Sequence, residues 1–181
     1  TILIFDSWIV NFEALKNNFI SIDLLTETNK IRTIKLKLMN LNKIFELTIS
    51  ASKLTSLNHR MIRHFKYLRI LELKYMPLMR FVDSNYLNDL HQFYLLIVQG
   101  LDFESTKYFR LNQTNSKNII RLFLEQNHIK HLDRESLSML TNLKHFSLSD
   151  NEISFLDERS FEKMIYLEKL DLNGNQIREI S

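Results

Sequence analysis

Apolar residues recur along the last third of the chain with a strict period of 24 residues. A first unit has its framework at Ile119, Leu122, Leu124, Asn127, Ile129, Leu132, Leu137 and Leu140. The same positions recur as Leu143, Phe146, Leu148, Asn151, Ile153, Leu156, Phe161 and Met164, and a third copy begins with Leu167, Leu170, Leu172, Asn175, Ile177 and Ile180. A fixed period of this length predicts a solenoid, in which each unit buries its apolar side chains against the next.

Each unit combines a short alternating segment with an asparagine. Alternation with a period of two places the framework leucines on the buried side of a short strand and their neighbours on the opposite, concave side. An asparagine at the following corner can satisfy backbone groups of the adjacent loop. Asn127, Asn151 and Asn175 therefore predict a buried ladder, which Ser52, Met76 and Leu101 interrupt in the earlier units.

The same framework continues towards the amino end with less regular spacing. We predict one domain over residues 1–181, with repeats at 19–43, 44–67, 68–92, 93–118, 119–142 and 143–166, a truncated repeat at 167–181, and the tail of an earlier repeat at 1–18. Repeat 68–92 has its framework at Leu68, Leu71, Leu73, Leu78, Phe81, Leu87 and Leu90. Parallel strands are expected near Ile22, Leu47, Leu71, Leu96, Leu122, Phe146 and Leu170, with irregular or briefly helical segments on the convex side.

The pattern LxxLxLxxNxIxxLxxxxFxxLxx in residues 119–181 resembles the leucine-rich repeat family, and most of all its 24-residue animal class. That class includes the ectodomains of Toll-like receptors and secreted insect immune or adhesion proteins. The resemblance implies an α/β horseshoe with a short-stranded parallel sheet on the concave face. It also implies protein or pathogen-derived ligands, no cofactor, and disulfide-bonded caps, which this chain lacks.

The absence of cysteine excludes a disulfide framework, a thiolate zinc site and a cysteine nucleophile. It suits a reducing cytosol, and equally a secreted protein without its capped ends. The sequon Asn112-Gln113-Thr114 favours an extracellular or cell-surface ectodomain and predicts an exposed, glycosylated Asn112. Because the framework stops at Ile180 and Ser181, we expect further repeats or a partner to cover that edge.

Several functional classes are disfavoured. The net charge of +3 is spread over interleaved acidic and basic residues, so nucleic acid binding is not indicated, and no apolar run is long enough for direct membrane contact. His128 and His131 lie three apart, but the repeat places them in a loop without a third ligand, which favours solvated side chains over zinc. Carboxylates recur at 133–135 and 157–159, as on a solvated convex face. Without a catalytic motif, we expect no enzymatic activity, no metal and no cofactor.

The variable positions between the leucines predict the binding site. Apolar residues gather there in the middle repeats, although the fold does not require them, and soluble proteins rarely expose such patches without a reason. The predicted ligand-binding residues are Ile70, Tyr75, Tyr94, Leu95, Ile97, Ile120 and Phe123, together with Arg121 and His145. The alternative is a slipped register that makes these side chains core. The sequence thus indicates recognition of a protein ligand or partner subunit by a receptor or adhesion protein, or alternatively an intracellular scaffold or adaptor.

Overall fold

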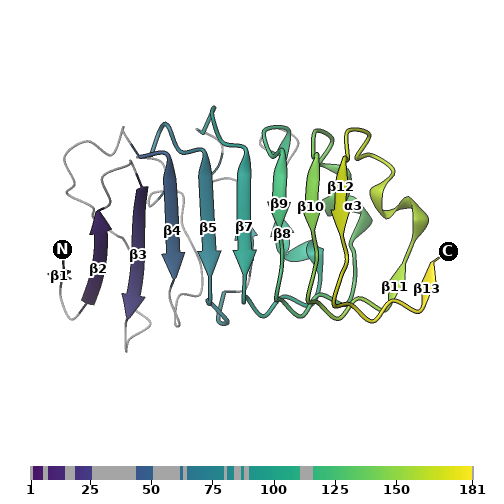
Figure 1. Cartoon of the computed structure of the whole chain (residues 1–181), viewed down its shortest axis with the longest axis horizontal. Coiled ribbons are helices and arrows are strands. Elements are labelled where there is room, and N and C mark those ends of the chain that lie inside the picture. Colours follow the sequence, from purple (N-terminus) through teal and green to yellow (C-terminus); the bar gives the residue numbers. More distant parts are fainter. Residues whose placement is uncertain are drawn as a thin grey trace.

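The computed structural model describes residues 2–5, 8–14, 19–25, 44–50, 62, 65–79, 81–83, 87, 90–110 and 116–180. Within this part, nine strands form one sheet in which they lie side by side in chain order (Figure 1). The strands are β1 (Ile2–Phe5), β2 (Trp8–Ala14), β3 (Phe19–Leu25), β4 (Glu46–Ser50), β5 (Ile70–Lys74), β7 (Leu95–Gln99), β9 (Arg121–Phe123), β10 (His145–Ser147) and β12 (Lys169–Asp171). From β3 to β12 all neighbours pair in parallel, which confirms the predicted parallel sheet.

The amino-terminal strands differ from the prediction. β1 pairs antiparallel with β2, and β2 pairs antiparallel with β3. Stacked regular repeats place neighbouring strands in parallel, so β1 and β2 do not pair as the strands of a regular repeat would, and the assignment of residues 1–18 to a partial or irregular repeat stays a prediction. Because an antiparallel pair needs only a tight turn, whereas a parallel pair needs a long crossover connection, this short segment contributes two strands.

The pairing of β3 with β4 also departs from the repeat alignment. Ile22 lies opposite Ile49, and Ile20 lies opposite Leu47, whereas the alignment placed Ile22 opposite Leu47. A shift of two residues leaves every side chain on the same face of the sheet. The apolar pattern alone therefore cannot distinguish the two registers.

Short pairs and helical turns connect the strands on the other side of the sheet. They are β6 (Val82–Asp83) with β8 (Phe109–Arg110), β11 (Phe155–Leu156) with β13 (Glu179–Ile180), the 3-10 turns η3 (Thr106–Tyr108) and η4 (Glu158–Phe161), and the helix α3 (Arg134–Ser138). The recurring carboxylates begin two of these elements. Asp133 accepts a hydrogen bond from the Ser136 amide at 2.8 Å, and Asp157 accepts one from the Arg159 amide at 2.8 Å. These aspartates are therefore N-caps.

Among the described residues, the core follows the predicted framework except in repeat 68–92 and in the truncated repeat 167–181, where Leu170 and Ile180 are exposed. Leu78 was expected to be buried but is 44% exposed, while Met79 and Val82 are buried in its place. Residues 77–78 form a turn, and the repeat is 25 residues long, so one additional residue is accommodated there. The downstream positions then return to the framework, with Leu87, Leu90 and Phe93 all buried.

The predicted asparagine ladder is present in the last repeats. The Asn151 amide group donates to the carbonyl oxygens of Leu124 and Leu148, each at 2.9 Å, and its oxygen accepts from the Ile129 amide at 3.1 Å. Asn127 and Asn175 make equivalent bonds one repeat earlier and later. Each asparagine thus joins two neighbouring turns and satisfies backbone groups that the core would otherwise leave without partners.

A left-handed residue precedes this column in five successive repeats. Tyr75, Gly100, Gln126, Asp150 and Gly174 have φ angles of 56°, 65°, 54°, 54° and 69°. Glycine adopts this conformation without strain, whereas a residue with a Cβ is disfavoured by about 1–2 kcal/mol. The recurrence shows that the corner geometry belongs to the repeat and is imposed even where the sequence does not supply glycine.

Candidate functional site

The three central strands carry apolar side chains on both faces of the sheet. Their framework residues, Leu71, Leu73, Leu96, Val98, Leu122 and Leu124, are all essentially inaccessible to solvent. The alternating residues Ile70, Leu95, Ile97 and Phe123 are only partly buried and face the concave side. The slipped register, in which Ile97 and Phe123 would belong to the core, is therefore contradicted.

Strand pairing brings most of the predicted site residues into adjacent rows. Ile70, Leu95, Arg121 and His145 are successive Cα partners across β5, β7, β9 and β10. Ile97 pairs with Phe123 in the next row. Tyr94 and Ile120 precede these rows and are joined by a hydrogen bond from the Ile120 amide to the Tyr94 carbonyl oxygen at 2.9 Å. We call Ile70, Tyr94, Leu95, Ile97, Ile120 and Phe123 the concave patch.

Tyr75 does not join the concave patch. It follows the end of β5, so it lies at the edge of the sheet opposite to Tyr94. The row formed by Lys74 and Gln99 separates it from the concave patch. Its side chain is 59% exposed, and its ring lies over Gly100, where a Cβ would be 2.9 Å from the ring atom Cδ1. Its position is thus set by the corner of the repeat.

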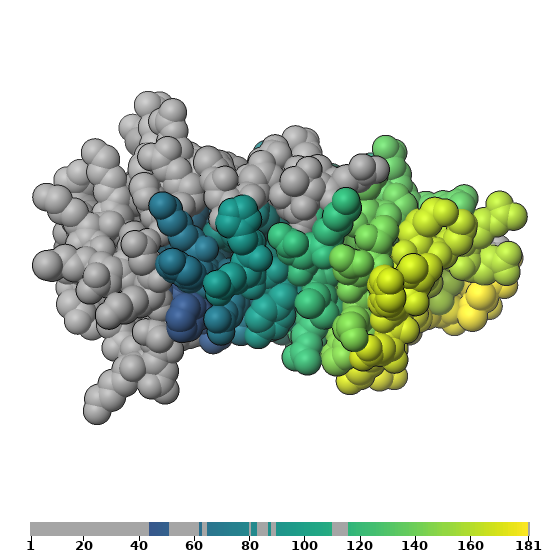
Figure 2. Space-filling model, turned by 90° about the horizontal axis from the view of Figure 1, so that it is seen from above, coloured from purple at the N-terminus to yellow at the C-terminus, as the bar shows by residue number. Residues whose placement is uncertain are grey.

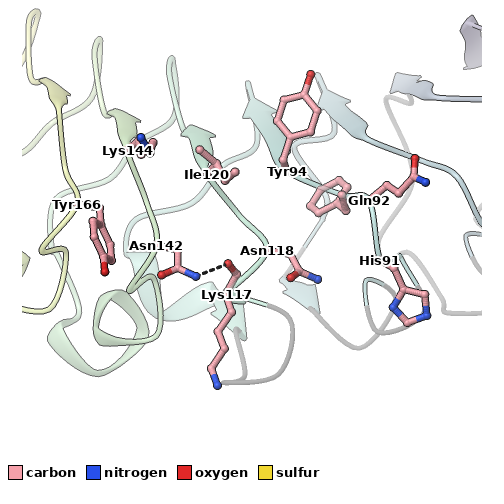
Figure 3. A pocket seen from close by; sticks show the side chains of 10 residues that line it. His91, Gln92, Tyr94, Lys117, Asn118, Ile120, Asn142, Lys144 and Tyr166 are labelled. Atoms are coloured by element: carbon pink, nitrogen blue, oxygen red, sulfur yellow. Dashed lines mark hydrogen bonds between the residues drawn. The ribbon is translucent and has the colours of Figure 1, made fainter.

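A groove of about 550 Å³ runs along the edge where the parallel strands begin. Figure 2 looks down on this edge, along which successive repeats follow one another in chain order from blue to yellow. In Figure 3, Ile120 lies between Tyr94 and Tyr166 along the groove, and Lys117 extends away from Ile120. The lining residues are His91, Gln92, Phe93, Tyr94, Lys117, Asn118, Ile120, Asn142, Lys144 and Tyr166.

The predicted site contains Tyr94 and Ile120 but none of the other lining residues, four of which share one repeat position. Gln92, Asn118, Asn142 and Tyr166 each come directly before a framework residue. Two of them already hold the loops together, because the Asn142 amide donates to the Lys117 carbonyl oxygen at 3.0 Å and Gln92 accepts from Arg69 Nε at 3.2 Å. Reading the variable columns two positions further towards the amino end, on the other side of the framework residue, would have found these four residues.

Charged residues flank the concave patch on its carboxyl-terminal side. Arg121, His145 and Lys169 are successive partners in one row, so they stand on neighbouring strands. Glu168 lies beside them, with its oxygens 2.6 Å from Lys144 Nζ and 3.7 Å from His145 Nε2. The hydrogen bond from Lys144, followed by its charge, lowers the pKa of Glu168.

A second polar cluster flanks the patch on its amino-terminal side. Glu72 accepts a hydrogen bond from the Thr48 hydroxyl at 2.9 Å and lies 2.8 Å from Lys74 Nζ. Burial, and then the charge of Glu72, raises the pKa of Glu46, while Lys74 opposes this effect. Glu72 and Lys74 form an ion pair with each other, so fewer unpaired charges remain on this side of the patch for a binding partner.

The two candidate metal-binding histidines lie apart from this surface. His128 Nδ1 is 2.6 Å from Glu152 Oε1, and Nε2 is 3.8 Å from Asp102 Oδ1. The hydrogen bond with His128 is the main cause of a lowered pKa for Glu152. Among the described residues, no three histidine or acidic side chains converge in a way that could hold a metal ion.

The structure bears on three further predictions only in part. Asn112 and its sequon lie outside the described residues. In the described ranges, no helix has both the length and the apolar content needed to cross a membrane. At the last strand of the sheet, Leu170 is 36% exposed, whereas its equivalents Leu122 and Phe146 are buried between neighbouring repeats.

Comparison with known proteins supports the repeat assignment. Residues 117–177 match the family model described as Leucine rich repeat. No curated protein matches the sequence.

Solved structures show the same fold at low sequence identity. An internalin from Listeria monocytogenes is 19% identical with a TM-score of 0.51, and the match covers 76% of this chain and 37% of the internalin chain. A chain of the Drosophila Toll–Spatzle complex is 17% identical with a TM-score of 0.52, covering 74% of this chain and 21% of that one. A chain of the glycosylated form of that complex is 12% identical with a TM-score of 0.57, and the match covers 97% of this chain and 33% of that one.

These structures are much longer than the present chain, which spans 21% to 37% of their length. At these identities the likeness is one of fold. The family match over residues 117–177, the parallel sheet and the asparagine ladder agree with one another. Residues 117–177 therefore belong to the leucine-rich repeat family, and the chain as a whole has the fold of leucine-rich repeat proteins.

Proposed function

We propose that this chain is a non-catalytic recognition module that binds a protein partner through the concave patch. The observation that supports this function is a contiguous set of aliphatic and aromatic side chains on a face that the core does not use. Such side chains act as interface anchors because burying each one contributes about 1.5–3 kcal/mol. Arg121 and His145 at its margin contribute to partner choice more than to affinity.

We further propose that the chain belongs to an extracellular receptor of innate immunity or adhesion. The likeness to a chain of the Toll–Spatzle complex, described as a hub in development and innate immunity, supports this assignment. The sequon at Asn112 favours it as well. The alternative is an intracellular scaffold or adaptor, which is favoured by the complete absence of cysteine.

The binding face is tested by the double variant Ile97→Ser and Phe123→Ser. Peptides selected from a random display library on the immobilised chain serve as the probe, and their affinity is measured by calorimetry. Because neither residue is part of the buried framework, the variant should retain its fold by circular dichroism. Binding should weaken by roughly 2 kcal/mol or more.

The matched control is Leu78→Ser with Phe155→Ser, which removes an aliphatic and an aromatic side chain that are both exposed elsewhere. The control should bind the selected peptides like the unchanged chain. Equal affinity of both double variants would refute the concave patch as the binding face. The compartment is tested by mass spectrometry of Asn112 in protein isolated from its source, where an N-glycan supports the extracellular assignment and its absence the intracellular one.

A further inference from the structure

Arg121, His145 and Lys169 form a row of cationic and ionisable side chains on three neighbouring strands; we call them the basic row. The row follows from the parallel register, which pairs Arg121 with His145 and His145 with Lys169. Neighbouring strands lie about 4.7–4.9 Å apart. Like charges placed opposite one another destabilise a sheet, so the fold itself gains nothing from this arrangement.

The described part of the chain provides few counter-ions for the basic row. Glu168 contacts His145 at 3.7 Å but makes its short contact, at 2.6 Å, with Lys144. Among the described residues, no carboxylate lies within ion-pair distance of Arg121 or Lys169. Both side chains are exposed. Within the part of the chain that the structure describes, Arg121 and Lys169 are thus available to an external anion.

The sign of the charged side chains changes along the strands, from their first to their last residues. Asp171 lies two residues after Lys169 on the same face, and Glu125 and Asp150 follow the ends of β9 and β10. The basic row therefore lies where β9, β10 and β12 begin, and these three acidic residues lie at or just after the ends of the same strands. A partner with its own charge separation would be held in one orientation by this polarity.

The groove supplies an apolar position next to the basic row. Ile120 lines the groove and directly precedes Arg121, while Lys144 lines it and directly precedes His145. None of the lining residues is acidic. Tyr94 and Tyr166 lie on either side of Ile120 along the groove (Figure 3). An apolar side chain seated on Ile120 would therefore lie between the two tyrosines along the groove, next to Arg121.

We propose that the partner presents an acidic peptide segment, whose carboxylates bind Arg121 and Lys169 while one aromatic or aliphatic side chain enters the groove over Ile120. This inference rests on the proposed function, because it specifies the chemistry of the segment that the same face binds. Arginine suits the role because its guanidinium binds a carboxylate through two parallel hydrogen bonds.

The test uses the peptides selected on the unchanged chain, first by their composition and then by their affinity for variants. The expected pool is rich in aspartate and glutamate around an aromatic or aliphatic residue. The charge-reversal variant Arg121→Glu with Lys169→Glu should weaken binding at least about tenfold, and raised salt should have a similar effect. The control Arg159→Glu with Lys107→Glu makes the same change of charge in η4 and η3 and should bind normally. If the charge-reversal variant fails to fold, Arg121→Gln with Lys169→Gln replaces it.

The outcomes separate this inference from the proposed function. If the selected peptides need Ile97 and Phe123 for binding but are not acidic, or if they bind the charge-reversal variant with unchanged affinity, the acidic partner is overturned and the binding face stands. If they bind the Ile97→Ser and Phe123→Ser variant with unchanged affinity, the binding face itself is overturned. Heparin serves as a probe for a site that binds any polyanion. If heparin binds the chain as tightly as the peptides do, and the Ile120→Ser variant binds both as well as the unchanged chain, the basic row is a polyanion site and the peptide groove is contradicted. A selection that yields no peptide for the concave side would reject both.

Discussion

Replacing Asn151 by alanine should destabilise the carboxyl-terminal repeats by about 2–4 kcal/mol. The side chain is 4% exposed and makes four hydrogen bonds to the backbone of two turns, with partners Leu124, Leu148, Ser149 and Ile129. After the substitution, each of the three carbonyl oxygens retains another donor, from Asn127, Asn175 and the Gln126 amide.

The magnitude follows from the group that loses its partner. The buried amide of Ile129 has Asn151 as its acceptor, and a buried donor without a partner costs about 1–3 kcal/mol. The other lost bonds add a smaller net term, because their carbonyl oxygens remain satisfied. The effect should therefore exceed that of removing an exposed side-chain hydrogen bond, which is about 0.5–1.5 kcal/mol.

Urea unfolding followed by circular dichroism measures the total effect. Native-state hydrogen exchange locates it, which matters because repeat arrays need not unfold in one step. Protection of the Ile129 amide should fall most. Asn142→Ala is the matched control, since Asn142 is exposed and, among the described residues, its side chain makes one hydrogen bond, to the Lys117 carbonyl oxygen at 3.0 Å. If both variants lose the same stability, the asparagine ladder is not a major source of stability and the reasoning is refuted.

Two further predictions concern stability near the site. Gly100→Ala should cost about 1–2 kcal/mol in urea unfolding, because φ is 65° and the new Cβ would lie 2.9 Å from the Tyr75 ring; a neutral result would contradict the left-handed corner. Glu46→Gln should stabilise the chain at pH 7. Burial and the charge of Glu72 raise the pKa of Glu46 in the folded state. The contribution of protonated Glu46 to the free energy of unfolding is therefore fully present below the ordinary glutamate pKa and is lost as the pH rises through the pKa of the folded state. The advantage of the glutamine variant should vanish in acid, and a difference that does not change with pH would refute this.

The binding face could be predicted from the sequence to the extent that the repeat governs it. A period of 24 residues places Arg121, His145 and Lys169 in equivalent positions, and parallel strands then make them neighbours. The same reasoning separated Ile97 and Phe123 from the buried leucines, because alternation with a period of two decides which face a side chain occupies. The asparagine ladder also follows from spacing alone, since each member meets the same backbone groups of the next turn.

Other features depended on how chain segments of unequal length meet in space. The additional residue at 77–78 exchanges Leu78 for Met79 in the core, and the antiparallel β1 and β2 end the pattern of parallel neighbours. The groove joins side chains from four repeats, among them Gln92 and Tyr166, whose positions depend on loop geometry rather than on apolar periodicity. The raised pKa of Glu46 likewise requires Glu72 on the adjacent strand. Periodicity determines which residues stack, whereas the path of the connecting loops decides what lies between the stacks.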